Sequence, residues 1–406
     1  MVMANAMLTL HGVEVRRGMN IVLRDFHLTA EAGEILALVG ENGSGKSTVL
    51  EAAAGLLPLE KGEVRHAEVA ILDSDGRRRR SLLNIGCVLQ KNGMIGSEVV
   101  DEHLRLACSK SGSLVDFSSL LEAFKLQHRS QDLVAHLSQG QARKVAVLAG
   151  LLPAFASKRP ALLLLDEPST GFDDDAVETL AQLLCQLRQA GHCIVMCTHD
   201  ERLVAIATQI LDVKSGEEIR QDAHDIGEHI ALESMPTRPI SPMSFGMAMH
   251  ARTMLWLNTN GIAALLALGV FVALGDFMTS LNDMQRLGFL LIPALAAGFC
   301  GDGLVGMLRE ERASTWWKAI GSSHPHAGPL PIVLGAIITL ISSVALQQDV
   351  QLQVILLGAI ICFTVWHLVR FLQQSTQRLA RPHAVFVGLL TPLMLLPFAI
   401  LVEWAS

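Results

Sequence analysis

The pattern of apolar and polar positions divides the chain into two unlike parts. Residues 254–406 carry 14 of the 71 charged side chains, and their apolar residues run in long stretches. Residues 1–253 carry the other charges, and their apolar residues form short runs between polar segments. Runs of about 20 apolar residues indicate membrane helices, whereas short runs bounded by turn residues indicate buried strands. The sequence therefore predicts an α/β domain followed by an all-α transmembrane domain.

Three short apolar runs in the first part predict buried strands, at residues 35–40, 161–165 and 192–197. Helix-like stretches lie at residues 49–57 and 142–152. Strands that alternate with helices are typical of a parallel sheet covered by helices. We therefore expect the first part to be a single α/β domain.

The second part contains five segments that are long and apolar enough to cross a bilayer. They are residues 254–275, 287–308, 329–347, 351–372 and 384–404. Pro392 and Pro397 interrupt the last segment, so it could instead dip into the bilayer and return. Cations gather in 309–328 and 370–383, and loops rich in cations face the cytosol. This pattern predicts a cytosolic first domain and, with five crossings, a C-terminus on the opposite side.

The domain boundaries follow from these patterns. We expect one domain over 1–224, a linker over 225–253 and a transmembrane domain over 254–406. The Met-rich stretch 243–254 is expected to be an elbow helix that lies along the membrane. The first 30 residues lack the basic and apolar regions of a cleaved signal peptide, so none is predicted.

Composition excludes two classes of protein. The formal net charge is −7 and the pI is about 6.1, which argues against nucleic acid held by a broad basic surface. The seven cysteines are an odd number in a long chain, which argues against a disulfide scaffold. Cys193 and Cys197 share one face of a predicted strand, where buried core is a better interpretation than a metal pair.

A glycine-rich sequence follows the first predicted strand and precedes a helix. Its pattern is G-x-x-x-x-G-K-S, whose glycines let backbone N–H groups turn toward a phosphate chain. Lys46 is expected to reach the β- and γ-phosphates, and Ser47 to ligate Mg²⁺. The candidate phosphate-binding residues are Gly40, Asn42, Gly43, Gly45, Lys46, Ser47 and Thr48. The pattern predicts an ATP site.

Two acids end the second predicted strand. Asp166 lies where an acid beside the phosphate loop can hold Mg²⁺ through water, and Glu167 is placed to polarise an attacking water. The third strand leads to Thr198-His199-Asp200, and the sequence Leu-Ser-Gln-Gly-Gln at 137–141 precedes a helical stretch.

The order of these motifs resembles the nucleotide-binding domain of ABC transporters, over roughly residues 7–220. The resemblance implies an α/β P-loop ATPase in which Gln90 links Mg²⁺ to the membrane part and His199 is the switch histidine. Ser138, Gly140 and Gln141 would form the signature that contacts the γ-phosphate held by an opposite subunit, and Asp173 would be the D-loop acid. Gln139 departs from the usual signature glycine. Arg17 stands near the position of the aromatic residue that stacks on adenine, so Arg17 either replaces it or the adenine contact is weaker.

The second part resembles the ABC-2 type permeases, and within them the membrane subunit of the cytochrome c maturation haem exporter. On this resemblance the loop 309–328 is a coupling element that docks on the ATPase domain, and haem is the leading candidate substrate. His367 or His383 could ligate haem iron, although interfacial histidines are common. Trp316 and Trp317 are better interpreted as an interfacial aromatic anchor.

Two further groups leave alternatives open. Asp302 either faces a substrate path or partner helix, or meets water at the end of a span. The run Arg77–Arg80 could touch anionic lipid, but a solvated loop is the favoured interpretation.

These features together predict one half of an ATP-driven transporter of the inner membrane. One chain supplies one phosphate loop and one signature, so a second half, identical or different, is required, and an extra membrane subunit is conceivable. We expect export of an amphipathic compound. A regulatory or mechanotransmission ATPase and an importer are the alternatives.

Overall fold

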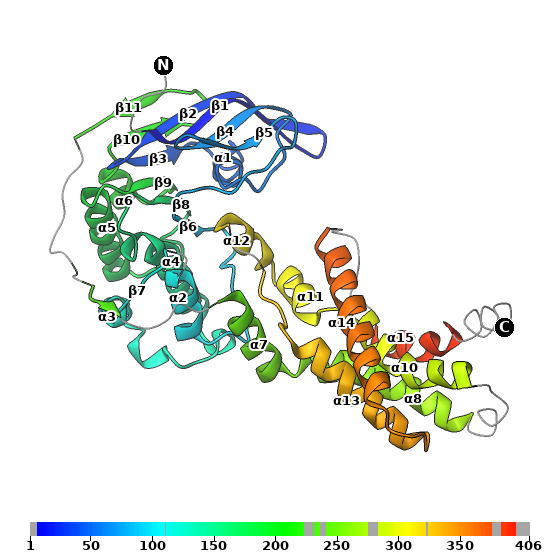
Figure 1. Ribbon diagram of the computed structural model, residues 1–406. Coiled ribbons are helices and arrows are strands. Elements are labelled where there is room, and N and C mark those ends of the chain that lie inside the picture. Colours follow the sequence, from blue (N-terminus) through cyan, green and yellow to red (C-terminus); the bar gives the residue numbers. More distant parts are fainter. Residues whose placement is uncertain are drawn as a thin grey trace. The chain divides into compact units, whose positions relative to one another are not determined.

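The computed structural model describes residues 6–109, 111–222, 230, 232–235, 241–274, 283–321, 324–375 and 383–394 (Figure 1). The chain forms two compact units. Unit 1 comprises Met1–Ser241 and Glu311–His324, and unit 2 comprises Pro242–Glu310 and Pro325–Ser406. The units thus divide at 241/242 rather than at the predicted boundaries 224/225 and 253/254. The segment 311–324, which the sequence assigned to the transmembrane domain, belongs to unit 1.

The centre of unit 1 is a six-stranded sheet with the strand order β11-β10-β3-β9-β8-β6. Its strands are β3 (Ile35–Val39), β6 (Ile85–Val88), β8 (Leu162–Asp166), β9 (Cys193–Cys197), β10 (Gln209–Asp212) and β11 (Glu218–Arg220). All neighbours are parallel except β10 and β11. Every residue of β8 and β9 is buried. Strands buried on both faces read as continuous apolar runs, so the sequence located three of these strands correctly.

A second, antiparallel sheet has the order β2-β1-β4-β5. Its strands are β1 (Ala6–Arg17), β2 (Asn20–Glu31), β4 (Lys61–His66) and β5 (Val69–Asp73). The short strands β7 (Leu114–Val115) and β12 (Ser234–Met235) pair with each other.

Unit 1 also contains helices. They are α1 (Lys46–Ala53), α2 (Val100–Ser109), α3 (Ser118–Ala123), α4 (Gln139–Phe155), α5 (Asp174–Gln189), α6 (Glu201–Ala205) and α12 (Ser314–Ala319), with 3-10 turns at Gln127–Arg129 and Val134–His136. Of these helices, α1, α4 and α5 pack on the parallel sheet. Helix α4 approaches β6 closely, because a Cβ atom on Gly86 would lie 1.9 Å from the carbonyl oxygen of Gly150. Two glycines therefore set the distance between the helix and the strand.

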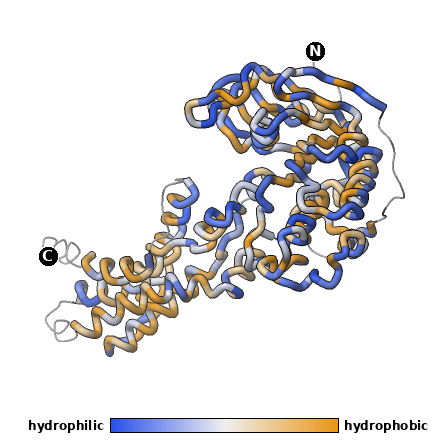
Figure 2. Tube along the Cα trace, turned by 180° about the vertical axis from the view of Figure 1, so that it is seen from behind, coloured by the Kyte–Doolittle hydropathy of each residue, from blue (hydrophilic) through white to orange (hydrophobic). Residues whose placement is uncertain are grey.

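Unit 2 is helical and apolar (Figure 2). It contains α7 (Pro242–Thr253), a π-helical turn (Leu257–Gly261), α8 (Ile262–Ala273), α10 (Asp283–Phe299), α11 (Gly303–Glu310), α13 (Leu330–Ala345), α14 (Leu352–Ser375), α15 (Ala384–Leu390) and a 3-10 turn (Thr391–Met394). Helices α13 and α14 pack tightly, because a Cβ on Gly335 would lie 2.7 Å from the carbonyl oxygen of Gly358. Such small-residue contacts let membrane helices approach closely.

Within the part of the chain that the structure describes, fewer helices are long and apolar enough to cross a membrane than the five segments that the sequence predicted. Among the described residues, two helices are long and apolar enough to cross, Gln285–Glu310 and Leu352–Ser375. Pro242–Thr253 and Leu257–Ala273, bent by 58° at the break between them, would together make a third. Helix α13 has only 16 residues, and of the predicted span 384–404 the structure describes residues to Met394. Pro397 and the C-terminus lie outside the described residues.

The polar residue Asp302 is buried in unit 2, which excludes one of the two alternatives left open by the sequence, that it meets water at the end of a span. It lies at the break between α10 and α11, where its carboxylate contacts His250 Nε2 at 3.0 Å and Arg370 Nε at 3.4 Å. A buried carboxylate requires such partners, because an unpaired charge in an apolar interior is costly. Asp302 therefore joins α7 to α14.

Candidate functional site

The phosphate loop connects the buried strand β3 to helix α1. Three of its glycines, Gly40, Gly43 and Gly45, have φ angles of 135°, 84° and 104°. L-residues with a side chain rarely adopt such angles. At Gly45 there is also little room, because a Cβ would lie 3.2 Å from Leu23 Cδ2. The glycines thus permit the tight turn that directs the loop around the N-terminus of α1.

Two side chains at the start of α1 point to the centre of the loop. Lys46 Nζ donates to the carbonyl oxygens of Gly40 and Glu41 at 2.7 and 3.0 Å. Ser47 Oγ donates to Asp166 Oδ1 at 3.1 Å. Burial raises the pKa of Asp166, and the hydrogen bond from Ser47 opposes that rise. The ends of β3 and β8 therefore bring a cation, a hydroxyl and a carboxylate together.

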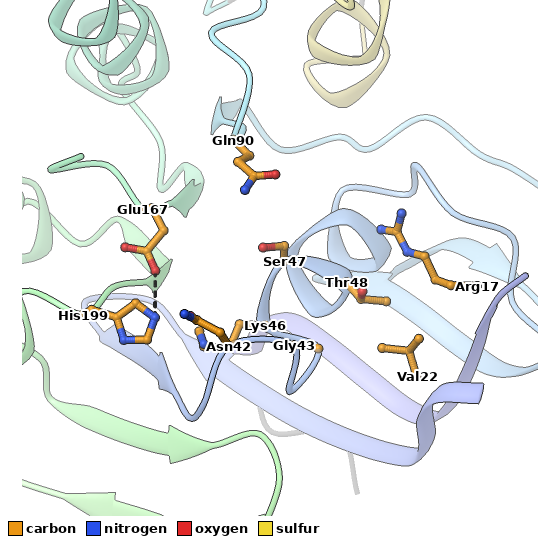
Figure 3. Close-up of a pocket in the computed structure, with 11 residues that line it drawn as sticks. Arg17, Val22, Asn42, Gly43, Lys46, Ser47, Thr48, Gln90, Glu167 and His199 are labelled. Atoms are coloured by element: carbon orange, nitrogen blue, oxygen red, sulfur yellow. Dashed lines mark ion pairs between the residues drawn. The ribbon is translucent and has the colours of Figure 1, made fainter. Parts of the chain in front are cut away.

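Glu167 follows β8 directly and lies opposite the loop (Figure 3). Its φ angle is 47°, and its backbone N–H donates to the carbonyl oxygen of Cys197 at 2.9 Å. His199 Nε2 lies 3.4 Å from Glu167 Oε1. Burial raises the pKa of Glu167, Asp166 raises it further, and His199 lowers it. A carboxylate with a raised pKa is a stronger base than an exposed one, so Glu167 is suited to polarise water.

A cavity of about 630 Å³ joins these groups. Its lining residues are Arg17, Val22, Asn42, Gly43, Gly45, Lys46, Ser47, Thr48, Gln90, Glu167 and His199. All but Val22 were proposed from the sequence, and Figure 3 shows Gln90 on the side of Glu167 and Arg17 beside Val22 at the other end. The tertiary structure therefore gathers residues from five separate segments of unit 1 around one cavity.

Arg17 ends β1 and forms an ion pair with Glu51 of helix α1. Arg17 also lines the cavity. Guanidinium groups stack on planar rings, with a carboxylate able to fix their plane. The arrangement agrees with either of the two roles considered for Arg17.

The sequence reasoning missed Arg143, a buried residue of α4. Its guanidinium donates to the carbonyl oxygens of Leu89 at 2.7 Å, Asp166 at 2.5 Å and Glu167 at 2.8 Å. Arg143 therefore ties the end of β8 to the residue before Gln90. The sequence did contain a signal for this role, because Arg143 is a cation in a largely apolar predicted helix, five positions after Ser138.

The signature residues lie outside this cavity. Ser138 caps helix α4, because its Oγ accepts from Gln141 N at 3.2 Å while Gln141 Oε1 accepts from Ser138 N at 2.9 Å. This reciprocal pair is a capping box. Gly140 instead lines a neighbouring cavity of about 450 Å³, which Gln90 and Glu167 also line.

Asp173 also lies outside the cavity around the phosphate loop. It precedes α5 and accepts from Lys144 Nζ at 2.7 Å, a hydrogen bond that lowers its pKa. The chain thus keeps Asp173 and the signature apart from its own phosphate loop.

The segment 311–324 packs on unit 1 through tryptophan. Trp316 on α12 is 2% exposed and its Nε1 donates to the carbonyl oxygen of Cys87, in β6, at 3.1 Å. Trp317 is also buried. The prediction of an interfacial anchor was wrong for both, because interfacial tryptophans keep one edge in water. The prediction that this loop docks on the ATPase domain agrees with these contacts.

Residues of unit 1 surround Trp316 and Glu311, and we call this binding surface the socket. The ring of His103 lies 4.8 Å from that of Trp316, and His103 Nδ1 is 2.5 Å from Glu98 Oε2, with both side chains fully buried. A Cβ on Gly93 would lie 2.6 Å from Trp316 Cβ. Glu311 Oε2 accepts from Gly96 N at 2.8 Å. The socket is thus made of residues 87–103, which include Gln90.

The donor set of the site fits Mg²⁺ held together with a nucleotide. Mg²⁺ prefers hard oxygen ligands and keeps several waters. Ser47 Oγ and Asp166 Oδ1 are 3.1 Å apart, and the Gln90 amide lines the same cavity. Among the described residues there is no cluster of three or more His, Cys, Asp or Glu suited to a metal. The metal would therefore depend on phosphate oxygens as further ligands.

Comparison with known proteins agrees with this geometry. Residues 23–170 match the sequence profile of the ABC transporter family. The macrolide export ATP-binding/permease protein MacB of Escherichia coli strain K12 is 29% identical over 206 residues, as is that of Shigella flexneri. The match covers 49% of this chain and 31% of each relative. The chain therefore spans less than a third of the length of these relatives.

Solved structures similar to unit 1 are ATP-binding cassettes. An ATP-binding subunit of an ABC transporter is 24% identical, with a TM-score of 0.46, over 53% of this chain and 90% of that one. A dimeric cassette bound to ADP and Pi is 26% identical, with a TM-score of 0.45, over 54% of this chain and 100% of that one. The matched family profile and the motif geometry together show an ABC ATPase P-loop fold in the N-terminal part, which the chain continues with a helical region of a few apolar helices.

Proposed function

We propose that the chain is one half of an ABC transporter, in which unit 1 hydrolyses ATP and unit 2 moves an amphipathic compound across a membrane. The observation that carries this proposal is the segment 311–324. The chain before and after this segment belongs to the apolar helical region. The segment itself packs in unit 1, where Trp316 donates to the carbonyl oxygen of Cys87. Cys87 lies three positions before Gln90, which lines the ATP cavity.

The residues around the phosphate loop suit ATP binding. The loop N–H groups and the N-terminus of α1 favour an anionic phosphate chain, and Lys46 adds a positive charge. Ser47 and Asp166, with Gln90, would hold Mg²⁺, which supplies charge neutralisation at the phosphates when it is bound. The base in our proposal is Glu167, whose carboxylate orients and deprotonates the attacking water while His199 holds its side chain.

Two copies are needed in this proposal. Ser138, Gly140 and Gln141 form a capped helix terminus that lies outside the chain's own phosphate-loop cavity. A capped helix N-terminus attracts anions, so a second half would present its signature to this phosphate loop. Glu167 in each half would then make both sites competent. The second half can be identical or different, and an extra membrane subunit is not required by the proposal.

Two observations bear on the direction and the substrate. The relatives at 29% identity are named macrolide exporters, which favours export of a bulky amphipathic compound from the cytosol across the inner membrane. Two described cavities of unit 2, of about 640 and 280 Å³, are lined almost wholly by apolar residues. Neither His367 nor His383 lines these two cavities, and His367 Nδ1 donates to the carbonyl oxygen of Phe363 at 2.9 Å. Haem is the second compound in the test below.

Transport by inside-out membrane vesicles tests the proposal. Vesicles that contain the full chain or Glu167→Gln would be given ATP and, in turn, a radiolabelled macrolide and haem. ATP-dependent accumulation that requires Glu167 is the expected result. ATPase activity that depends on Glu167 and stays independent of both compounds, without accumulation, would favour a regulatory or mechanotransmission ATPase. ATP-dependent loss of preloaded compound would favour an importer.

A further inference from the structure

The loop between β5 and β6, residues 74–84, combines four cations with an exposed apolar side chain. Residues 74–80 are all exposed, including Arg77–Arg80. Leu82 is 85% exposed, which is unusual for a leucine in unit 1, where most apolar side chains are buried. We name residues 74–84 the arginine loop.

Backbone hydrogen bonds hold the arginine loop in a defined shape. Arg77 N donates to Asp73 Oδ1 at 3.0 Å, and Arg79 N donates to the carbonyl oxygen of Ile71 at 2.9 Å. The arginine side chains are thus displayed from a fixed backbone. A ligand that binds these side chains therefore does not have to order the backbone, and this lowers the entropic cost of binding.

The residue before Leu82, Ser81, is anchored to unit 1 by hydrogen bonds. Ser81 Oγ lies 3.0 Å from Nδ1 of His66, a buried residue whose Nε2 donates to the carbonyl oxygen of Ala53 at 2.8 Å. Burial lowers the pKa of His66 to about 4, so the imidazole is neutral and can accept from the Ser81 hydroxyl near neutral pH. Ser81 Oγ also accepts from Leu83 N at 3.1 Å, so the chain bends at Leu82, whose side chain is left exposed.

Few acids neutralise the four arginines. Arg77 has an exposed partner, Asp75, at 4.0 Å. Within the described part of the chain, no acidic group lies within ion-pair distance of Arg78, Arg79 or Arg80. The loop is therefore a local positive surface on a chain whose net charge is −7.

The arginine loop also lies beside the segment that leads into the apolar helices. A Cβ on Gly321 would lie 3.9 Å from Arg80 Cγ and 4.0 Å from Arg80 Nε. Gly321 follows α12, on which Lys318 is exposed, and precedes α13 (Leu330–Ala345) by nine positions. Arg80, at the end of the run of four arginines, thus lies next to the chain segment that continues into an apolar helix.

We propose that the arginine loop binds the anionic headgroups of the cytosolic leaflet, with Leu82 entering the interface between headgroups and acyl chains. The proposal rests on the proposed function, because it takes unit 1 to lie on the cytosolic side of a bilayer. Cations near an anionic leaflet each strengthen association about fivefold. An apolar side chain beside such cations adds burial in the interface.

Quenching of a fluorescent label on the loop by spin-labelled lipid headgroups tests the proposal. All seven native cysteines are buried, so a thiol-reactive fluorophore on Ser74→Cys reports on the loop. The full chain would be placed in nanodiscs of phosphatidylcholine with a constant fraction of headgroup-spin-labelled lipid and an increasing fraction of phosphatidylglycerol. Quenching should rise with the phosphatidylglycerol fraction and should disappear at about 1 M salt, where the Debye length falls to about 3 Å.

Four variants separate the contributions. Replacing Arg77–Arg80 by Gln should abolish the dependence on phosphatidylglycerol, whereas replacing them by Lys should keep most of it. Leu82→Ser should raise the phosphatidylglycerol fraction at half-maximal quenching several-fold. The double variant Lys158→Gln/Arg159→Gln removes two exposed cations elsewhere on unit 1 and should behave like the parent chain.

Two results would overturn the proposal. One is equal quenching in the four-Gln variant and the parent chain at every lipid composition. The other is complete reversal by inorganic phosphate at constant ionic strength, which would identify a free anion as the ligand. Glu167-dependent ATPase activity of the four-Gln variant, measured in parallel, shows that the variant is folded. It also keeps a failure of this proposal separate from a failure of the proposed function.

Discussion

Trp316 donates its indole N–H to the carbonyl oxygen of Cys87 at 3.1 Å, although the two residues are 229 positions apart in the sequence. The bond connects α12, which lies between two apolar helical stretches, to the strand that leads to Gln90. A displacement of α12 therefore changes a contact three positions from a residue of the ATP cavity.

Replacing Trp316 by Phe should loosen the docking of α12, because it keeps a ring in the socket but removes the donor to Cys87. A neutral hydrogen bond contributes about 1 kcal/mol, which corresponds to an approximately fivefold larger undocked population. The initial rate of tryptic cleavage at Arg312 and Lys318 measures that population. Thr315→Ala, an exposed position on the same helix, is the control, and equal cleavage of both variants would contradict the prediction.

Gly93→Ala should undock α12 more strongly than Trp316→Phe. The φ angle of Gly93 is 73°, and the added Cβ would lie 2.6 Å from Trp316 Cβ. Gly112→Ala is a matched control, since Gly112 has a φ of 78° with nothing within 4 Å of its Cβ position. The same cleavage assay should show a large increase for the first variant alone. A similar increase in both would mean that backbone strain, and not the contact with Trp316, is responsible.

The pH dependence of ATP hydrolysis should report the environment of Glu167. Burial raises the pKa of this carboxyl above its ordinary value of 4.5, and the base acts when it is ionised. Activity should therefore fall as the pH drops through this raised pKa. Because His199 lowers the pKa of Glu167, His199→Ala should move the acidic limb of the remaining activity to higher pH. An acidic limb that does not move, or that moves equally in the exposed-site control His128→Ala, would exclude this coupling.

Arg143→Ala should destabilise unit 1 and lower kcat. The substitution leaves the buried carbonyl oxygens of Leu89 and Asp166 without this donor, at about 1–3 kcal/mol for each. For a domain of this size that corresponds to a fall of about 4–12 °C in Tm. Arg143→Lys should recover only part of the loss, because an ammonium cannot reach three carbonyls in one plane. Differential scanning fluorimetry measures the shift, and Lys158→Ala, at an exposed position, should leave Tm unchanged.

Arg17→Ala should raise the KM for ATP with little change in kcat, if the guanidinium stacks on the base. The loss of a contact that is present before and during the reaction affects binding alone. Arg17→Trp should then restore or lower the KM, because an aromatic ring can stack on adenine in the same place. An unchanged KM in both variants would remove Arg17 from the binding site. Glu51→Gln tests whether the ion pair fixes the guanidinium, and it should give an intermediate KM.

Local patterns were sufficient for much of unit 1. The strands around 35–40, 161–165 and 192–197 were located from apolar runs, because strands buried on both faces leave that signature. The phosphate-loop residues were also identified from spacing alone, since the turn and its ligands occupy one continuous stretch between Gly40 and Thr48. Both kinds of prediction need only the backbone geometry of a few successive residues.

Local sequence patterns were less informative where the same residue type occurs in several structural environments. Apolar runs predicted five spans, but a run does not show where a helix bends, as between Pro242–Thr253 and Leu257–Ala273, or stops after 16 residues, as in α13. Trp316 and Trp317 looked like interfacial anchors because tryptophan next to apolar segments is common there. Their burial in unit 1 depends on contacts that no local pattern encodes.

The sequence by itself determined the parallel sheet, the phosphate loop and the pair of acids, since each arises from short-range chain geometry. Only the tertiary structure decided that α12 packs on β6, that Arg143 joins Leu89 to Asp166, and that His250 and Arg370 enclose Asp302. These contacts join residues that are far apart in sequence. Their formation depends on which surfaces the folded elements bring together, and on the cost of leaving a buried donor, acceptor or charge without a partner.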